Sequence, residues 1–121
     1  AMSNETLDML RFKGFVYQNF KTTDKGFIYL KITDEIRAEF NLTYEEASSV
    51  VNMLAGVQGF NVWALFIEDG DVVRIRLRSS GPDIDKVANL FNGGGHAKAS
   101  GAVLNSWDEL DGFIEAVHAV L

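Results

Sequence analysis

The segment from Asn92 to Gly101 holds the densest set of groups in the chain that could bind an anion. It contains three consecutive glycines, Gly93, Gly94 and Gly95. Glycines let the backbone enter left-handed conformations and let a ligand approach closely, and successive N–H groups can then converge on an anion as a nest. His96 follows as a directional donor, with Lys98 and Ser100 as a long and a short donor. Three glycines alone are a weak signal, and a flexible connector with an incidental histidine fits the same residues equally well.

Three arginines alternate along one predicted strand, at Arg74, Arg76 and Arg78, and Ser79 follows them. Alternate residues of a strand share a face, so the three guanidinium groups are expected to lie together. With Asp69-Gly70 as a two-residue hairpin turn, Leu65 pairs with Arg74 and Trp63 pairs with Arg76. Guanidinium groups beside an indole would form a platform for phosphates and stacked bases. On this pattern alone we favour the plainer interpretation, a solvated strand face on which arginines cover an exposed tryptophan.

The sequence lacks the usual residue patterns of a hydrolytic or redox centre. It has no cysteine, no G-x-x-x-x-G-K-[ST] loop and no G-x-G-x-x-G after a predicted strand. No aspartate–histidine cluster has metal-ligand spacing. Of the two histidines, His118 belongs to the last predicted helix, and we expect it to be structural or surface-facing rather than a partner of His96. We therefore predict a binding role, with no catalytic residue, metal ligand or cofactor in this chain.

The charge of the chain is unevenly distributed. Its net charge of −6 argues against non-specific binding of long nucleic acid. Residues 74 to 101 nevertheless carry five basic and two acidic side chains, a local charge of +3 on an otherwise acidic body. This distribution suits a small anionic ligand better than a duplex. We find no apolar run near the roughly 20 residues that span a bilayer, and we expect a cytoplasmic domain that binds no membrane.

Aromatic and β-branched runs, separated by turn residues, predict the sheet. Five strands are expected, at residues 15–20, 27–32, 61–68, 71–78 and 99–104. The first two strands would form a hairpin across residues 22–26, and the third and fourth would form a hairpin across Asp69-Gly70. We predict a single domain of the α/β (α+β) class, with a mixed sheet of about five strands flanked by helices.

Capping residues predict the helices. They are expected at residues 3–12, after Thr33, from Thr43 to Gly56, from Pro82 to Phe91, and after Ser106. Thr43 with Glu46, and Ser106 with Glu109, have the spacing of a capping box. The helix from Pro82 to Phe91 leaves Arg78 and enters the glycine segment. A strand, helix and loop of this length can bring Arg78, Ser79, the loop amides and His96 to one edge of the sheet.

Several of these residues together resemble a known family. They are Arg78-Ser79, the helix Asp83 to Ala88, the run Gly93-Gly94-Gly95-His96, and Ala99-Ser100-Gly101. The pattern resembles the DHH-associated domain, the C-terminal half of nanoRNases, 3′-phosphoadenosine 5′-phosphate phosphatases, cyclic dinucleotide phosphodiesterases and RecJ-type exonucleases. By this resemblance residues 14–121 are the domain. Residues 1–13 are expected to be a cloning remnant, Ala1-Met2, and the end of an interdomain connector in a longer protein.

The resemblance implies a phosphoesterase of the DHH superfamily that degrades short oligoribonucleotides. A separate N-terminal DHH domain would hold manganese and hydrolyse the phosphodiester. In this chain Arg78 and Ser79 would contact the substrate phosphate or sugar, and Gly93 to Gly95 with His96 would contact the terminal phosphate or base. Arg76 and Ser100 complete the expected substrate-binding residues. The implied partners are a short single-stranded RNA or nucleotide, the DHH domain and, in the parent protein, a second copy.

Alternatives remain open from the sequence. The domain could belong to a cyclic dinucleotide phosphodiesterase or a RecJ-type exonuclease, because the family motif often has a fourth glycine where Asn92 stands and other side chains at Ala97 and Lys98. An interpretation of another class is a non-catalytic module that binds a protein through the sheet face of Trp63 and Leu65. Alanyl-tRNA synthetase tails, which share a related domain, rank last because their glycine motif lacks this histidine context.

Overall fold

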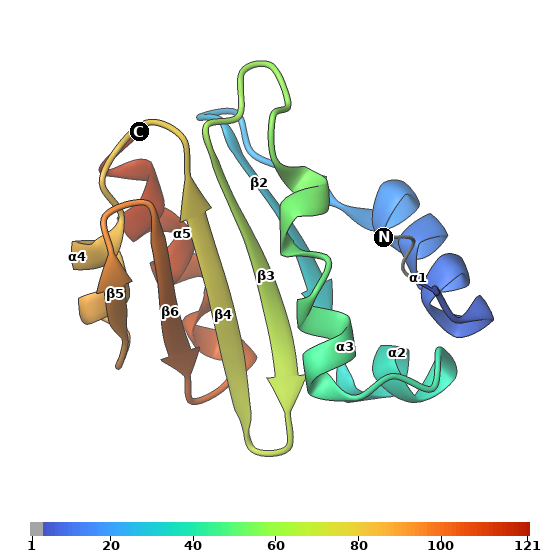
Figure 1. Cartoon of the computed structure of the whole chain (residues 1–121). Helices are drawn as coiled ribbons and strands as arrows, with labels where there is room; N and C mark the ends of the chain where they lie inside the picture. Colours follow the sequence, from blue (N-terminus) through green and yellow to red (C-terminus); the bar gives the residue numbers. More distant parts are fainter. Residues whose placement is uncertain (1–3) are drawn as a thin grey trace.

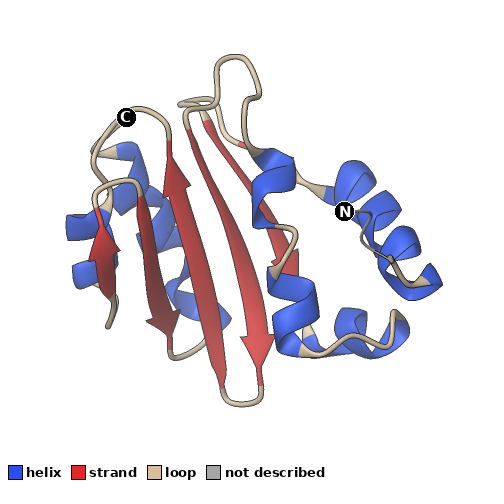
Figure 2. Cartoon of the chain, viewed as in Figure 1, coloured by secondary structure: helices blue, strands red, loops and turns tan. Residues whose placement is uncertain are grey.

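The computed structural model describes residues 4–121 and shows a mixed six-stranded sheet (Figure 2). The strands are β1 (Lys21–Thr22), β2 (Phe27–Ile32), β3 (Val62–Asp69), β4 (Val72–Ser79), β5 (Gly94–His96) and β6 (Ala99–Leu104). They are arranged in the order β1-β2-β3-β4-β6-β5, with β2 and β3 parallel and the other neighbours antiparallel. The predicted mixed sheet is confirmed, with one strand more than expected, because the glycine segment itself forms β5.

Helices lie on both sides of the sheet (Figure 1). They are α1 (Leu7–Asn19), α2 (Asp34–Glu39), α3 (Tyr44–Ser48), α4 (Asp85–Asn89) and α5 (Leu110–His118), with 3₁₀ turns η1 (Val51–Leu54) and η2 (Trp107–Glu109). One hydrophobic cluster joins the sheet to α4 and α5, and a second joins β2 and β3 to α1, α3 and η1. The second cluster contains no residue of β4, β6 or β5, so that side of these three strands lies outside the core.

The burial of β3 and β4 follows from their residue patterns. β3 reads as a continuous apolar run from Val62 to Ile67, and every one of these side chains is buried. A continuous apolar run is typical of a strand covered on both faces. In β4, valine, isoleucine and leucine alternate with arginine, and only the apolar side chains enter the core. One face of β4 therefore remains available for ligands.

The N-terminal part of the fold differs from the prediction. Residues 15–19, predicted as a strand, belong to α1, which is capped by the Thr6 side chain and buries Phe12 and Val16. These two positions are four residues apart, the spacing that aligns side chains on one helix face. The predicted domain boundary between residues 13 and 14 thus falls inside α1. The predicted cloning remnant, Ala1-Met2, lies outside the described residues.

The predicted helix starts are largely confirmed. Thr33 caps α2, and Thr43 with Glu46 forms the expected capping box at the start of α3. The helix predicted as far as Gly56 is divided into α3 and η1, and Gly56 follows with a left-handed φ of 75°. The helix predicted from Pro82 begins only at Asp85. The predicted capping box of Ser106 and Glu109 is wrong: the Ser106 hydroxyl accepts from the Asp108 N–H and caps η2, and the Glu109 carboxylate accepts from the Asn105 N–H.

The β3–β4 hairpin has a different turn from the one predicted. Asp69 pairs with Val72, so the two turn residues are Gly70 and Asp71. Gly70 has a φ of 63° at the first turn position, where type II′ turns require glycine. The register is therefore shifted by two residues from the prediction. Because side chains alternate with a period of two, this shift leaves every residue on its predicted face.

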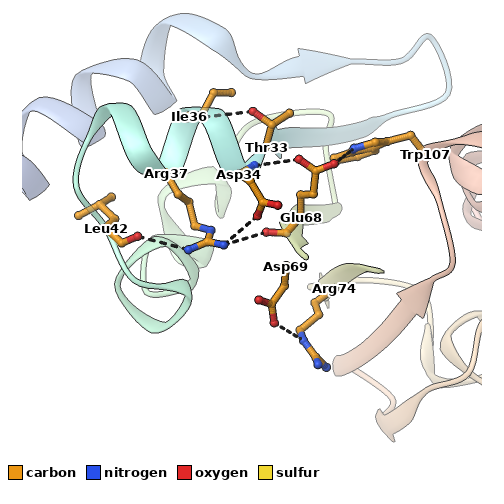
Figure 3. A network of polar contacts seen from close by, with 9 residues as sticks. All are labelled: Thr33, Asp34, Ile36, Arg37, Leu42, Glu68, Asp69, Arg74 and Trp107. Carbon is orange, nitrogen blue, oxygen red and sulfur yellow. Dashed lines mark hydrogen bonds and ion pairs between the residues drawn. The ribbon is translucent and has the colours of Figure 1, made fainter. Parts of the chain in front are cut away.

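A polar network closes the end of the sheet opposite Ser79 (Figure 3). The Glu68 carboxylate accepts hydrogen bonds from the Asp34 N–H and from Trp107 Nε1, both at 2.9 Å. Arg37 donates to Asp34 at 2.9 Å and to the Glu68 carbonyl at 3.3 Å. The network ties α2 and η2 to β3, on both sides of the sheet.

Candidate anion-binding site

Arg78 and His96 lie in one row across the sheet. Arg78 pairs with Ala99 on β6, and Ala99 pairs with His96 on β5. Paired residues of neighbouring strands project from the same face. The register therefore places Arg78 and His96 on one face of the sheet, with only the methyl group of Ala99 between them, and that both face one ligand stays a prediction.

The Arg78 side chain extends from β4 toward β6. Its Nη1 donates to the Leu77 carbonyl at 2.9 Å and to the Ser100 carbonyl at 3.2 Å. Partial burial, and secondly the charge of Arg76, lower the pKa of Arg78 from its ordinary value. Arginine stays protonated in proteins, so Arg78 keeps its positive charge in a partly buried position, where the attraction of a nearby anion would offset the cost of desolvation.

Arg76 lies beside Arg78 and points the other way. It donates to the Ser48 carbonyl at the end of α3, at 3.1 Å. Within residues 4–121 neither Arg76 nor Arg78 forms an ion pair, whereas Arg74 pairs with Asp69 at 2.9 Å and Lys98 pairs with Asp83 at 2.8 Å. The site thus contains two neighbouring cations without a carboxylate, an arrangement that favours anion binding.

Ser79 and Ser100 are buried and use their hydroxyl groups inside the protein. The Ser79 hydroxyl donates to the Pro82 carbonyl at 2.5 Å and accepts from the Gly81 N–H at 3.0 Å. The Ser100 hydroxyl donates to the His96 carbonyl at 2.7 Å. They follow Arg78 and Ala99 in their strands, and successive strand residues project from opposite faces, so their hydroxyl groups lie on the other face of the sheet from the row. Their hydrogen bonds shape the turns on either side of the row, and that the two hydroxyl groups contact substrate stays a prediction.

The glycine segment does not form the expected nest. Neighbouring N–H groups of a strand point to opposite sides, so those of Gly94 to His96 do not converge, and the Gly93 N–H donates to the Ala88 carbonyl. Close packing requires these glycines instead. A Cβ at Gly93 would lie 2.0 Å from the Gly101 carbonyl oxygen, and one at Gly95 would lie 2.8 Å from that of Ala99. Asn92 adopts a φ of 60°, a conformation that asparagine tolerates in place of glycine.

A groove of about 300 Å³ runs beside the Arg78–His96 row. Its lining includes Tyr44, Arg74, Arg76, Asn92, Gly93 and Gly101. Sequence reasoning did not assign Tyr44 or Gly101 to a site. A usable signal was present in β6, where Ala99 and Gly101 alternate as small residues opposite the arginines and leave the sheet surface uncovered.

Trp63 and Leu65 are not available to any ligand. Their exposed fractions are 7% and 0%, because α1, α3 and η1 cover this face of β3. Both interpretations of this face are therefore wrong, the platform with an indole among the arginines and the favoured solvated face with an exposed tryptophan. The protein-binding surface built on these two residues is wrong as well. The continuous apolar run of β3 was the signal that both its faces are buried.

Within residues 4–121, no group of three or more histidine, cysteine, aspartate or glutamate side chains lies close enough to hold a metal ion. His118 Nε2 lies 2.7 Å from the Thr23 hydroxyl, so His118 has a structural contact, as predicted. No helix in this part of the chain is long and apolar enough to cross a membrane.

Comparison of the sequence with known proteins identifies relatives of this chain. The model of the DHHA1 domain family matches residues 24–121. The chain is 39% identical over 105 residues to the bifunctional oligoribonuclease and PAP phosphatase NrnA of Bacillus subtilis, covering 87% of this chain and 34% of that protein. It therefore spans about a third of the length of this relative.

Two solved structures are similar in fold. An exopolyphosphatase-related protein from Bacteroides fragilis has a TM-score of 0.84 and 26% sequence identity, over 96% of this chain and 35% of that protein. The C-Ala domain of Aquifex aeolicus alanyl-tRNA synthetase has a TM-score of 0.61 and 16% identity, over 84% of this chain and 97% of that domain. The second likeness shows a shared fold.

Proposed function

From the premise that the chain belongs to the DHHA1 domain family, we propose that it holds one end of a short oligoribonucleotide for hydrolysis by a separate domain. The observation that carries this proposal is the cross-sheet row of Arg78, Ala99 and His96. It combines a planar cation suited to phosphate with a directional donor or acceptor. The small Ala99 leaves room for the ligand between them.

Each residue has a defined part in this proposal. Arg78 binds the phosphate of the terminal nucleotide through the N–H groups that do not contact the Leu77 and Ser100 carbonyls. His96 is exposed on the edge strand and hydrogen-bonds the terminal phosphate or base. Ser79, Ser100 and the glycines hold these two side chains in place through the turns and strands that they stabilise.

Catalysis belongs to the rest of the parent protein in this proposal. The relative from Bacillus subtilis is named as an oligoribonuclease and PAP phosphatase, and this chain matches about a third of it. We assign the manganese ions, which would activate water, to the DHH domain, because the described residues offer no metal-binding cluster. This chain alone is expected to bind substrate without hydrolysing it.

The test is an NMR titration of this chain with RNA of two to five nucleotides. We expect shifts localised at Arg78, Gly93 to Gly95 and His96, with an affinity on the order of 10⁻⁴ M, near the non-specific range, because the catalytic domain is missing. Arg78→Ala and His96→Ala should each abolish the localised shifts. Arg11→Ala removes an exposed arginine on α1 and serves as the charge-matched control.

Unchanged binding in both site variants would exclude this proposal. A second measurement follows the same titration at several salt concentrations. Each lost phosphate contact should reduce the log–log salt slope by about 0.7 for a single strand. Arg78→Ala should therefore flatten the slope by that amount, and Arg11→Ala should not change it.

A further inference from the structure

We propose that the groove lined by Tyr44, Arg74, Arg76 and Gly101 is a second nucleotide subsite, so that the domain binds the substrate over at least two successive nucleotides along β4. This inference rests on the proposed function, which concerns only the terminal nucleotide at the Arg78–His96 row. It adds a direction and a minimum length, with the chain of the ligand running from Arg78 toward Arg74.

The spacing of the arginines supports this direction. Arg78, Arg76 and Arg74 occupy alternate positions of β4, so their Cα atoms are about 7 Å apart along the strand. Successive phosphates of an extended single strand have a similar separation. Arg76 has no carboxylate partner among residues 4–121 and lies next to Arg78, so it is available to bind the second phosphate.

The floor of the groove is formed by β6. Gly101 pairs with Arg76, and its neighbour in the next row, Ala99, pairs with Arg78. A Cβ at Gly101 would meet only the Ile75 carbonyl oxygen, at an ordinary contact distance of 3.5 Å. Glycine is therefore not required there by the packing of the sheet. Its effect is to keep the surface between Arg76 and the Asn92-Gly93 wall open, at a volume near the lower end of small-ligand sites.

Tyr44 provides an aromatic ring on the opposite wall. It is the first residue of α3, directly after the Thr43–Glu46 capping box, which fixes where the helix begins. The ring is partly packed against the second hydrophobic cluster and also lines the groove. An aromatic side chain beside cationic residues is the usual arrangement for stacking a base of a single strand. We assign the second phosphate to Arg76 and the second base to Tyr44.

Arg74 has a lesser part. Its Nε donates to Asp69 at 2.9 Å, so its charge is partly neutralised by a neighbouring carboxylate. It closes the far end of the groove and adds attraction for a third phosphate without providing a full site. A nucleoside monophosphate has one phosphate and one base, so it would contact only the Arg78–His96 row and leave the second subsite empty.

The experiment compares three ligands on this chain: adenosine monophosphate, a 5′-phosphorylated dinucleotide RNA and a 5′-phosphorylated trinucleotide RNA. Gly101→Val fills the floor of the groove with a residue suited to a strand. We expect it to weaken binding of both RNAs by about tenfold or more and to leave binding of the monophosphate unaffected. Tyr44→Leu should weaken RNA binding by at least about fivefold, as expected for one lost stack, whereas Tyr44→Phe should retain it. Thr22→Val, on the exposed strand β1, is the matched control for an added valine.

The outcomes distinguish the two proposals. Equal binding of RNA by Gly101→Val and the wild type, with binding still lost in His96→Ala, would overturn the second subsite and retain the proposed function. Equal weakening of the monophosphate and the RNAs by Gly101→Val would also overturn it. If His96→Ala and Arg78→Ala bind all three ligands as the wild type does, the proposed function itself fails, and the second subsite fails with it.

Discussion

Arg78 and His96 lie 18 positions apart in the sequence and two strands apart in the sheet, with Ala99 as their common neighbour. The pairing of β4 with β6 and of β6 with β5 produces this relationship. β5 is an edge strand made of two glycines and His96, and β6 carries small residues on the same side. The sheet thus presents a cation and an imidazole on an uncovered surface.

We predict that Ala99→Leu abolishes ligand binding without unfolding the domain. Ala99 is partly exposed, and a larger side chain would project between the Arg78 guanidinium and the His96 ring, into the space that the ligand needs. The affinity for a dinucleotide should fall by tenfold or more in an NMR or calorimetric titration. Val57→Leu, in the exposed segment before β3, is the control and should leave the affinity for the dinucleotide unchanged. Wild-type affinity in Ala99→Leu would contradict the position assigned to the ligand.

We predict that Gly93→Ala destabilises the domain. The added methyl group would lie 2.0 Å from the Gly101 carbonyl oxygen and 2.6 Å from Ala102 Cα, both of which belong to the backbone of β6. Forcing these strands apart should lower the free energy of unfolding by about 1–3 kcal/mol or more. Chemical denaturation monitored by circular dichroism measures this change.

The control for that experiment is Gly112→Ala. Gly112 lies in α5, and a Cβ there would meet no atom within 4 Å. Alanine is favoured over glycine inside a helix, so this variant should gain about 0.5–1 kcal/mol. Two substitutions of the same chemistry are thus expected to shift stability in opposite directions. If Gly93→Ala leaves the free energy of unfolding unchanged, β5 can move away from β6 at little cost.

We predict a pH-dependent contact beside the site, between Asp83 and Lys98. A hydrogen bond from Lys98, and secondly its charge, lower the pKa of Asp83 below its ordinary value. Lys98 also donates to the Gly81 carbonyl and so links the β5–β6 turn to the segment after β4. In Lys98→Met the pKa of Asp83, followed by carboxyl-carbon NMR, should rise toward the value of a free aspartate. Lys25→Met, in the β1–β2 turn, should not change it.

The sign of the stability effect follows from this lowered pKa. A carboxylate with a folded-state pKa below its unfolded-state pKa stabilises the fold above the unfolded value, which is about 3.9 for aspartate. The stabilisation is lost as the pH falls through the lowered folded-state pKa. Asp83→Asn should therefore be less stable than the wild type near neutral pH, and the difference should disappear in acid. A difference that persists below both pKa values would contradict the role of the Asp83–Lys98 pair.

The sequence alone determined much of the local structure, because the signals are carried by neighbouring residues. The capping box of Thr43 and Glu46 depends on hydrogen bonds within one turn, and it was predicted correctly. The alternation of arginine with apolar residues in β4 placed each side chain on its face even though the turn was assigned two residues away. The wrong prediction of a strand at residues 15–19 also arose from signals carried by neighbouring residues. Aromatic residues favour a strand locally, and only packing of Phe12 and Val16 against β2 and β3 made this segment helical.

The sequence alone also determined which residues could bind an anion, and it pointed to the family through Arg78-Ser79 and the glycine–histidine run. Only the tertiary structure decided which of these groups meet. Trp63 shares its sheet face with the arginines, yet α1, α3 and η1 cover it, while the same face of β4 and β6 stays open. The position of a covering helix depends on contacts between distant segments, which no local pattern specifies. The same reason explains Tyr44 and Gly101, which come from α3 and β6 and form one groove only after the chain has folded.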